Sequence, residues 1–392
     1  MTLCFQSHSA TITRMRKKNP FLTTGYEGRE TFCDREHETS ELISAIENGR
    51  NVTLIAPRRY GKTGLIKNMM AELSDDYEKV YLDIYATESL SDFVELFAKT
   101  CLSSLESTRE KVISSLGRFF GSLRPCITPQ TDGSIKWSFD LAEPLAKESL
   151  AMTFDFLRSR SRPVVIAIDE FQQVRSYPEK GVEAMLRSHI QFLPNVRFVF
   201  AGSRLHLMSD MFVQPRGAFY NSTDILSLDV IDRKIYCDFA AKFFQTEKLP
   251  FSDEAFFDLY DRFDGVTWYI QAVLNRIWQA NCGFVSAKDT DGAIDSLVGT
   301  RSLVYMDLFR SQSEVLCAVL KAVAQEGVAK MPTGRDFLSR YSLGSASTVS
   351  SALESLVRKE LLYRSYDGYI VYDRLFGIWL KRLCHEYRGM SM

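Results

Sequence analysis

The fold of this chain is decided by the stretch Asn51-Val-Thr-Leu-Ile-Ala-Pro-Arg-Arg-Tyr-Gly-Lys-Thr-Gly-Leu-Ile-Lys-Asn68. Residues 52–55 form a short apolar run with β-branched side chains, which predicts a buried strand. The apolar residues Leu65, Ile66 and Met69 follow at helical spacing. A strand, an eight-residue loop and a helix are the context that a phosphate-binding Walker A loop requires.

The residues between this strand and this helix predict the chemistry of a nucleotide site. Backbone N–H groups of such a loop and of the helix N-terminus surround phosphate oxygens. Lys62 would reach the β- and γ-phosphates, and the Thr63 hydroxyl would hold a Mg²⁺ ion that bridges them. Gly61 adopts a positive φ at low cost where the backbone approaches phosphate. The predicted nucleotide-binding residues are Ala56, Pro57, Arg58, Arg59, Tyr60, Gly61, Lys62, Thr63 and Gly64.

Ala56 departs from the strict G-x-x-x-x-G-K-[ST] pattern, because it stands where the first glycine belongs. Alanine keeps the loop small, so we interpret it as a tolerated variant. A chance Gly-Lys-Thr turn is the alternative interpretation, and the strand before it and the helix after it disfavour that alternative.

The composition indicates a globular protein of two or three domains, with 392 residues, a net charge of −1, 45% hydrophobic and 25% charged residues. A near-neutral chain has no general attraction for nucleic acid or membranes, so such a role needs a local patch. No apolar run approaches the roughly 18 residues of a membrane span. The eight cysteines are scattered without a C-x-x-C pair, which disfavours a metal site and a disulfide framework. We therefore expect reduced thiols in a cytoplasmic protein without a membrane partner.

The N-terminal region divides into a tail and a first structured segment. Residues 1–18 mix Ser, Thr and His with a basic cluster and lack the apolar region of a signal peptide, so we predict a disordered tail. Residues 38–46 predict an amphipathic helix that ends at Asn48-Gly49. Residues 32–36, just before it, allow two interpretations: an ordinary capped helix start, or a flap on the adenine side of a nucleotide.

Two adjacent carboxylates follow the apolar run Pro163-Val-Val-Ile-Ala-Ile168, which predicts a central parallel strand buried on both faces. Binding sites of open α/β sheets lie at such strand ends. Asp169 would hold the Mg²⁺ shell, and Glu170 would polarise the attacking water as a general base. A solvated Asp-Glu pair is the alternative, but the Walker A loop farther upstream favours the catalytic interpretation.

Three further segments complete the predicted sheet. Residues 196–202 form another apolar run and end at Ser203, which is either a sensor that hydrogen-bonds the attacking water or the γ-phosphate, or a polar cap on the strand. Residues 79–85 and 224–228 predict the remaining strands. Strands that alternate with helices at this spacing indicate right-handed crossovers and an α/β fold with a five-stranded parallel sheet.

The remaining patterns predict an insertion and two C-terminal units. An alternating stretch at residues 126–139 contains Asp132-Gly133, which predicts a β-hairpin. The helical patterns at 234–244, 253–263 and 268–279 indicate a small lid. From residue 313, three helices, a two-stranded wing turning at Asp367-Gly368 and a closing helix follow the winged-helix order. The predicted domains are a core at 19–228 with an insertion at about 106–150, a lid at 229–301 and a winged helix at 302–392.

Taken together, these segments resemble the prokaryotic AAA+ ATPase family often called archaeal ATPase-like, which is close to the STAND signalling NTPases. The resemblance extends from about residue 19 to the C-terminus, and it implies a P-loop core, a helical lid and a C-terminal winged helix. It also includes Ala201-Gly-Ser-Arg-Leu-His-Leu-Met208, Ala218-Phe-Tyr-Asn-Ser-Thr223 and Asp373-Arg-Leu-Phe-Gly-Ile-Trp-Leu380.

The resemblance implies ATP as the nucleotide. By position it assigns phosphate, magnesium, base and sensor roles to Lys62, Thr63, Asp169, Glu170 and Ser203. Two positions depart from the family pattern: Gly217-Ala218 stand where Arg-Pro is common, and Trp268 replaces the proline of a Gly-x-Pro sensor. The arginine that completes hydrolysis is therefore left open among Arg204, Arg216, Arg262 and one supplied in trans.

Two functions remain in competition, and a third is disfavoured. The first is Mg²⁺-dependent ATP binding and hydrolysis that drives a conformational switch of lid and winged helix. The alternative is a nucleotide-regulated DNA-binding regulator, whereas a scaffold without turnover is disfavoured by Glu170. From Lys330 onward there are ten basic and six acidic residues. The polar residues of the candidate recognition helix at 347–359 are mostly Ser and Thr, with only Arg358 and Lys359 basic at its end. We therefore expect weak DNA binding, and favour a protein partner or self-association.

Overall fold

The computed structural model describes residues 18–106, 108, 112, 126–129, 135–138, 143–280 and 283–389. These residues form two compact units. The sheet unit comprises Thr24–Ala240 and Tyr260–Ile270, and the helical unit comprises the other described residues. The predicted tail lies outside the described residues except for Lys18. The predicted lid contributes residues to both units, so its boundaries at 229 and 301 stay a prediction.

The sheet unit is built on five parallel strands, which confirms the predicted fold class. The strands lie in the order β2-β5-β6-β1-β7, and each neighbouring pair is parallel. Because β6 lies between β5 and β1, its end is flanked by the loop after β1 and by the end of β5. The strands are β1 (Val52–Ile55), β2 (Glu78–Asp83), β5 (Val164–Asp169), β6 (Val196–Gly202) and β7 (Asp224–Ser227).

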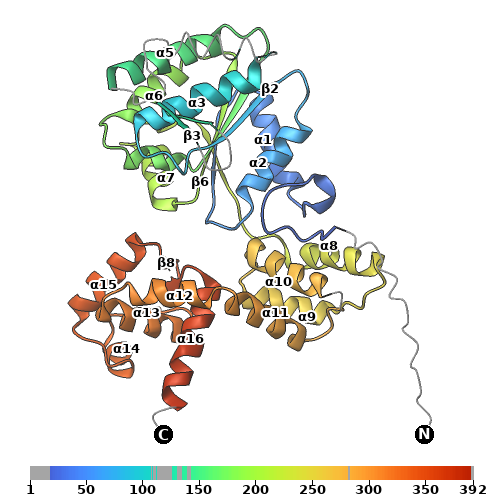
Figure 1. Cartoon of the computed structure of the whole chain (residues 1–392), viewed down its shortest axis with the longest axis vertical. Coiled ribbons are helices and arrows are strands. Elements are labelled where there is room, and N and C mark those ends of the chain that lie inside the picture. The colour runs from blue at the N-terminus through green and yellow to red at the C-terminus, as the bar shows by residue number, and fades with distance from the viewer. Residues whose placement is uncertain are drawn as a thin grey trace. The chain divides into compact units, whose positions relative to one another are not determined.

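Helices cover both faces of this sheet (Figure 1). The buried strand β5 shows why: Val164, Ile166 and Ile168 pack into one hydrophobic core, while Val165 and Ala167 pack into the other. One face carries α1 (Glu36–Glu47) and α2 (Lys62–Glu72). The opposite face carries α3 (Leu90–Leu105), α5 (Glu143–Arg158), α6 (Val182–Ile190) and α7 (Leu205–Phe212).

The predicted hairpin is present between α3 and α5 along the chain. β3 (Cys126–Pro129) and β4 (Ile135–Ser138) pair antiparallel, with Cys126 opposite Ser138. The predicted turn at Asp132-Gly133 lies outside the described residues. α5 begins at Glu143, so the last part of the predicted insertion is helical.

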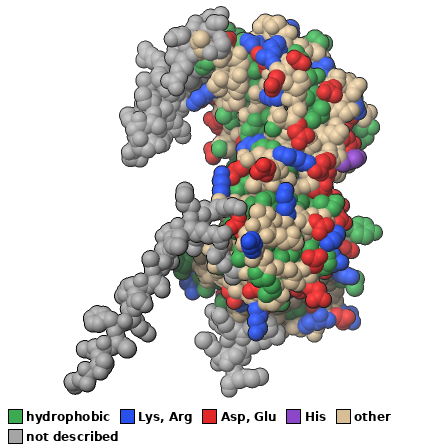
Figure 2. Space-filling view, turned by 90° about the vertical axis from the view of Figure 1, so that its right-hand side faces the viewer, with side chains coloured by type: hydrophobic (Ala, Val, Ile, Leu, Met, Phe, Trp, Pro, Cys, Tyr) green, Lys and Arg blue, Asp and Glu red, His purple; other side chains and the backbone are tan. Residues whose placement is uncertain are grey.

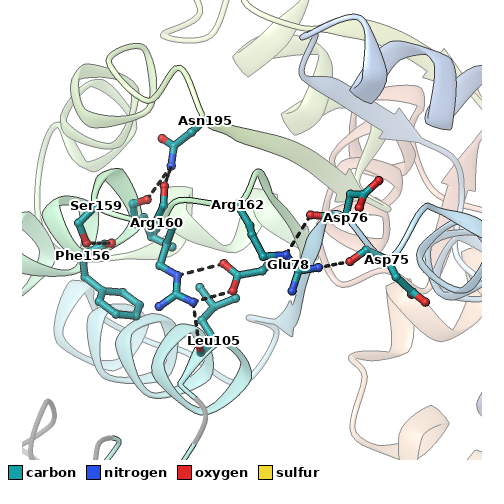
Figure 3. A network of polar contacts seen from close by, with 10 residues as sticks. Asp75, Asp76, Glu78, Leu105, Phe156, Ser159, Arg160, Arg162 and Asn195 are labelled. Atoms are coloured by element: carbon teal, nitrogen blue, oxygen red, sulfur yellow. Dashed lines mark hydrogen bonds and ion pairs between the residues drawn. The ribbon is translucent and has the colours of Figure 1, made fainter.

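A polar network links the segments that precede β2, β5 and β6, at the end of the sheet where these strands begin (Figure 3). The Arg160 guanidinium donates to both carboxylate oxygens of Glu78, at 3.0 and 2.6 Å, and to the carbonyl oxygen of Leu105 at 3.0 Å. Arg162 donates to the backbone carbonyls of Asp75 and Asp76. Bidentate pairing of this kind fixes geometry as well as adding energy. At the other end of the sheet, where the strands have their C-terminal residues, loops follow the strands.

The helical unit contains the larger part of the lid helices, and the N-terminal segment packs against them. Phe21 is fully buried, with its ring centroid 5.6 Å from Phe244 and 5.8 Å from Trp278. Three helices begin and end within two residues of their predicted bounds: α8 (Arg233–Thr246), α9 (Asp253–Arg262) and α10 (Thr267–Gln279). α11 (Ala287–Gly299) and α12 (Ser302–Arg310) were not predicted.

The C-terminal part of the helical unit has the predicted winged-helix order. α13 (Glu314–Glu326), α14 (Arg335–Arg340) and α15 (Ala346–Arg358) precede the antiparallel wing strands β8 (Leu362–Arg364) and β9 (Tyr369–Val371), and α16 (Arg374–Gly389) closes it. Gly368 is required at the wing turn, because its φ is 150° and a Cβ there would lie 2.5 Å from the carbonyl oxygen of Ala329. Among the described residues, we find no helix long and apolar enough to span a membrane.

Candidate functional site

The loop between β1 and α2 has the backbone that the Walker A pattern predicts. Gly61 adopts φ 95° at the N-terminus of α2, and Lys62 and Thr63 open the helix. Arg59 also lies in the left-handed region, with φ 74°, which is uncommon for a residue other than glycine. The amide of Ala56 donates to the carbonyl oxygen of Gly202 on β6 at 3.4 Å, so the loop starts where two strands end together.

Lys62 is buried, and its ammonium is held by the loop itself. Its Nζ donates to the carbonyl oxygens of Ala56 at 2.8 Å and of Pro57 at 3.1 Å. Burial lowers the pKa of Lys62, and the nearby carboxylates of Glu170 and Asp169 oppose that shift. The charges of both predicted carboxylates therefore act on the ammonium, which the loop predicted to surround phosphate holds by two hydrogen bonds.

Asp169 joins the loop to the strand ends. The Thr63 hydroxyl donates to Asp169 Oδ2 at 2.6 Å, and the Tyr81 hydroxyl donates to the same oxygen at 3.1 Å. The amide of Glu170 donates to Asp169 Oδ1 at 3.0 Å. Asp169 is 2% exposed, and this set of donors satisfies a carboxylate that would be costly to bury alone. The structure thus brings together the two residues predicted to hold Mg²⁺.

Glu170 lies at the turn that follows β5. Its φ is 55°, in the left-handed region, and it precedes the 3₁₀ helix η2 (Phe171–Ser176). The Ser203 hydroxyl donates to Glu170 Oε2 at 2.7 Å, and the Gln172 side-chain amide donates to the same oxygen. The predicted base and the predicted sensor are therefore in direct contact.

The remaining loop side chains contact aromatic rings. The Arg58 guanidinium carbon lies 5.6 Å from the ring centre of Tyr85. That of Arg59 lies 4.6 Å from Trp268 and 4.8 Å from Tyr269, and Arg59 also hydrogen-bonds the Tyr269 hydroxyl. Nucleotide contacts of Arg58, Arg59 and Tyr60 stay a prediction.

Three residues of this site escaped the sequence analysis: Tyr81, Asp83 and Gln172. Asp83 ends β2 and lies opposite Asp169 in the sheet register. Partial desolvation raises the pKa of Asp83, although the residue is exposed at the end of β2, and the charges of Asp169 and Glu170 raise it further. Tyr81 precedes Asp83 by two positions, so a polar alternation at the end of a strand was the available signal. For Gln172, the only signal in the sequence was its position two residues after Glu170.

The segment before α1 lies beside the loop helix. The Phe32 ring lies 3.1 Å from the position that a Cβ on Gly64 would take, and Tyr26 meets Phe32 edge-on with centroids 5.6 Å apart. Arg35 precedes α1 with φ 73° and makes no side-chain cap hydrogen bond. The helix therefore lacks the side-chain cap of an ordinary capped start, and the adenine-side flap stays a prediction.

The three candidate arginines occupy different places in the fold. Arg204 follows Ser203 and precedes α7, Arg216 is exposed before β7, and Arg262 ends α9. Which of them completes the site stays open.

Residues 32–273 match the family described as an ATPase domain predominantly from Archaea. The chain belongs to this family. Residues 303–382 match a probable winged helix domain. These matches confirm the resemblance from which ATP was inferred, and they confirm the winged helix that the order of the elements predicted. No curated protein matches the chain.

Two solved structures share the fold at low identity. The Walker-type ATPase PABY2304 of Pyrococcus abyssi is 17% identical, with a TM-score of 0.64, over 92% of this chain and 99% of that one. The second structure is that of the ORC2 protein of Aeropyrum pernix, whose description names ADPNP–ADP complexes. It is 12% identical, with a TM-score of 0.51, and the match covers 94% of this chain and 98% of that one. Identity this low establishes the common fold alone.

Proposed function

We propose that this member of the ATPase family binds ATP with Mg²⁺ and hydrolyses it, and that turnover switches the conformation of lid and winged helix. One observation carries the proposal: the end of β5 brings Asp169 against Thr63 and Glu170 against Ser203, at 2.6 and 2.7 Å. An ammonium, a hydroxyl and two carboxylates beside a Walker A backbone are the parts that phosphoryl transfer needs.

Lys62 and the loop would bind the phosphates. The Nζ of Lys62 points to the loop interior, where the carbonyl oxygens of Ala56 and Pro57 accept its hydrogen bonds. Phosphate oxygens carry more charge than carbonyl oxygens, so they would compete for this ammonium. Thr63 and Asp169 offer the hard oxygen ligands that Mg²⁺ takes, and the ion would neutralise charge on the phosphates.

Glu170 would act on the attacking water. The water would give a proton to the Glu170 carboxylate as its oxygen bonds the γ-phosphorus, and the bond from that phosphorus to the bridging oxygen would break, releasing ADP. The Ser203 hydroxyl donates to Glu170 Oε2 at 2.7 Å, which supports a role in orienting the base.

The switch rests on a link between the loop and the first turn of α10. The amide of Trp268 donates to the carbonyl oxygen of Arg59 at 3.1 Å, and the Arg59 guanidinium lies against the Trp268 and Tyr269 rings. A change in the loop on nucleotide binding would therefore act on α10, which belongs to the predicted lid.

The experiment that tests this function is ATP turnover by the purified full chain across a concentration series, with and without duplex DNA. We expect Mg²⁺-dependent release of phosphate. Turnover per chain that rises with concentration would indicate that a neighbouring copy completes the site. Absence of phosphate release under all conditions would contradict hydrolysis.

A nucleotide-regulated DNA-binding regulator remains the alternative, because residues 303–382 match a winged-helix domain. The solvent face of α15 argues for weak binding, since it presents Ser347, Ser350 and Ser351 together with Glu354, and the helix has one basic residue, Arg358, in its last turn. On the face of the molecule shown in Figure 2, which is not the side on which Figure 1 labels α15, basic and acidic side chains are intermixed. DNA readers concentrate positive charge on one face, so a protein partner or a second copy of the chain fits the hydroxyl-rich face of α15 better.

A further inference from the structure

Gln172 has one end of its side-chain amide engaged and the other end without a partner. The residue is 2% exposed, and its Nε2 donates to Glu170 Oε2. Its Oε1 is buried and makes no hydrogen bond to any described residue. Burying a polar atom without a partner costs free energy, so a purely structural role would favour an apolar side chain at this position.

The surrounding backbone explains how the amide is held. A Cβ added to Gly202 would lie 2.4 Å from Gln172 Oε1 and 2.4 Å from Met208 Sδ. The amide therefore packs against bare backbone at the end of β6. Turning the amide over would place its oxygen against the Glu170 carboxylate, where two acceptors repel. The orientation with a donor toward Glu170 is therefore the favourable one, although it leaves Oε1 without a partner.

A second donor reaches the same carboxylate oxygen. The Ser203 hydroxyl donates to Glu170 Oε2 at 2.7 Å, so Oε2 accepts from two side chains. Within the part of the chain that the structure describes, we find no hydrogen bond to Glu170 Oε1. The carboxylate is thus fixed through one oxygen, and the other oxygen is available as a proton acceptor.

We propose that Gln172 is a positioning residue for Glu170: together with Ser203 it fixes Oε2, so that Oε1 is the atom that accepts the proton of the attacking water. This inference rests on the proposed ATP hydrolysis. The backbone of Glu170 is in the left-handed region, and the two donors define the direction of a side chain that starts from this turn.

The deciding variant is Gln172→Met, which keeps the length of the side chain and removes both the donor and the unpartnered acceptor. We expect kcat to fall about tenfold to a hundredfold, the scale of a lost hydrogen bond to a charged group, while the Kd for Mg·ATP stays unchanged. Thermal stability should be equal or higher, because the buried orphan oxygen is gone. A purely structural role would leave kcat unchanged in this variant.

Gln173→Met is the matched control. Gln173 lies next in the chain and donates to the carbonyl oxygen of Thr87 at 3.0 Å, so its replacement should leave kcat near that of the wild type. In a Glu170→Gln background, Gln172→Met should cause no further loss of kcat, because the group it positions has already been replaced. Additive losses in this double variant would overturn the proposal.

Wild-type kcat in a folded Gln172→Met protein would also overturn the positioning role while leaving ATP hydrolysis intact. A wild-type chain without turnover would instead overturn the proposed function, and this inference with it. Ser203→Ala removes the other donor with a small change in volume, so it continues the test if Gln172→Met does not fold. Unchanged kcat in Ser203→Ala would then contradict positioning through Oε2.

Discussion

The Arg59 guanidinium carbon lies 4.6 Å from the ring centre of Trp268, and the Trp268 amide donates to the Arg59 carbonyl oxygen at 3.1 Å. The resemblance implies a proline at position 268, and proline has no N–H to donate. The tryptophan therefore provides two contacts that a proline would not. Because Arg59 belongs to the loop and Trp268 to the first turn of α10, the tryptophan at this departure from the family pattern links the loop to α10.

Arg59→Ala should loosen the loop. Two aromatic rings lose their cation partner, and we expect a loss of about 1–2 kcal/mol in the free energy of unfolding, measured by urea denaturation. Hydrogen exchange of residues 56–61 should become faster. Arg58→Ala is the matched control, because its guanidinium faces the single ring of Tyr85 at 5.6 Å. Equal effects of the two replacements would contradict a special role for the Arg59 contact.

Lys62→Ala should abolish ATP binding that calorimetry detects at ordinary concentrations, with the fold retained. Its ammonium lies inside the loop and bonds two carbonyl oxygens, so no shift of the helix is needed to present it to phosphate. Lys67→Ala, one turn farther along α2 with its Nζ over the Tyr81 ring, should keep binding. If Lys62→Ala bound ATP with the affinity of the wild type, the loop would not be the phosphate-binding element that we propose.

Glu170→Gln should bind Mg·ATP and lose about 10²–10⁴ in turnover, the usual scale of a general base. Glutamine keeps the size of the side chain and cannot accept the proton of water. Single-turnover kinetics beside calorimetry separate this loss from a change in affinity. If phosphate release were unaffected, Glu170 would be a solvated strand-end carboxylate.

Asp83→Asn should stabilise the nucleotide-free chain at pH 7. Partial desolvation of Asp83, which is exposed at the end of β2, together with the charges of Asp169 and Glu170, raises its pKa in the folded state, so its charged form opposes folding above that pKa. Below the unfolded pKa of about 3.9 the group is neutral in both states, and the gain should vanish. Asparagine can still accept from the Tyr85 amide, as Asp83 Oδ1 does at 2.8 Å. Thermal unfolding followed from pH 7 to pH 4 should therefore show a Tm advantage that shrinks with acid; an advantage independent of pH would exclude charge as its cause.

The parts of this site that follow local rules could be predicted from the sequence. The strand–loop–helix pattern predicted Gly61 and Lys62, and the apolar run before Asp169 predicted a strand buried on both faces. The contact of Glu170 with Ser203 depends on the strand order, in which β6 adjoins β5. Gln172 could not be found in this way, because its role depends on Gly202 leaving space and on the direction of one amide.

The missed helix α11 shows a different limit. It contains three aspartates and two glycines, which weaken helix propensity, and these hid its pattern. Its buried residues Ala293, Ile294, Leu297 and Val298 nevertheless follow helical spacing, and Ser286 and Asp289 form a capping box at its start. The helical spacing and the capping box were therefore present in the sequence, although the composition of the segment is unfavourable for a helix.

The last prediction concerns the winged helix, which we expect to report on nucleotide state and not to be an independent high-affinity DNA reader. Its exposed α15 face offers hydroxyls, Glu354 and one arginine, Arg358 in the last turn, where readers commonly place arginines. A complex driven by phosphate contacts weakens with salt by a power close to the number of phosphates neutralised. With so few basic residues, the association should be non-specific and should disappear near physiological salt.

Hydrogen exchange of residues 345–372, with and without a non-hydrolysable ATP analogue, measures the proposed coupling. Protection should change with nucleotide in the wild type and not in Lys62→Ala, which serves as the control because it lacks the phosphate contact. Identical protection in both states of the wild type would separate the winged helix from the nucleotide site. Nanomolar, sequence-specific DNA binding without nucleotide would favour the regulator, since such affinity and specificity need direct base contacts.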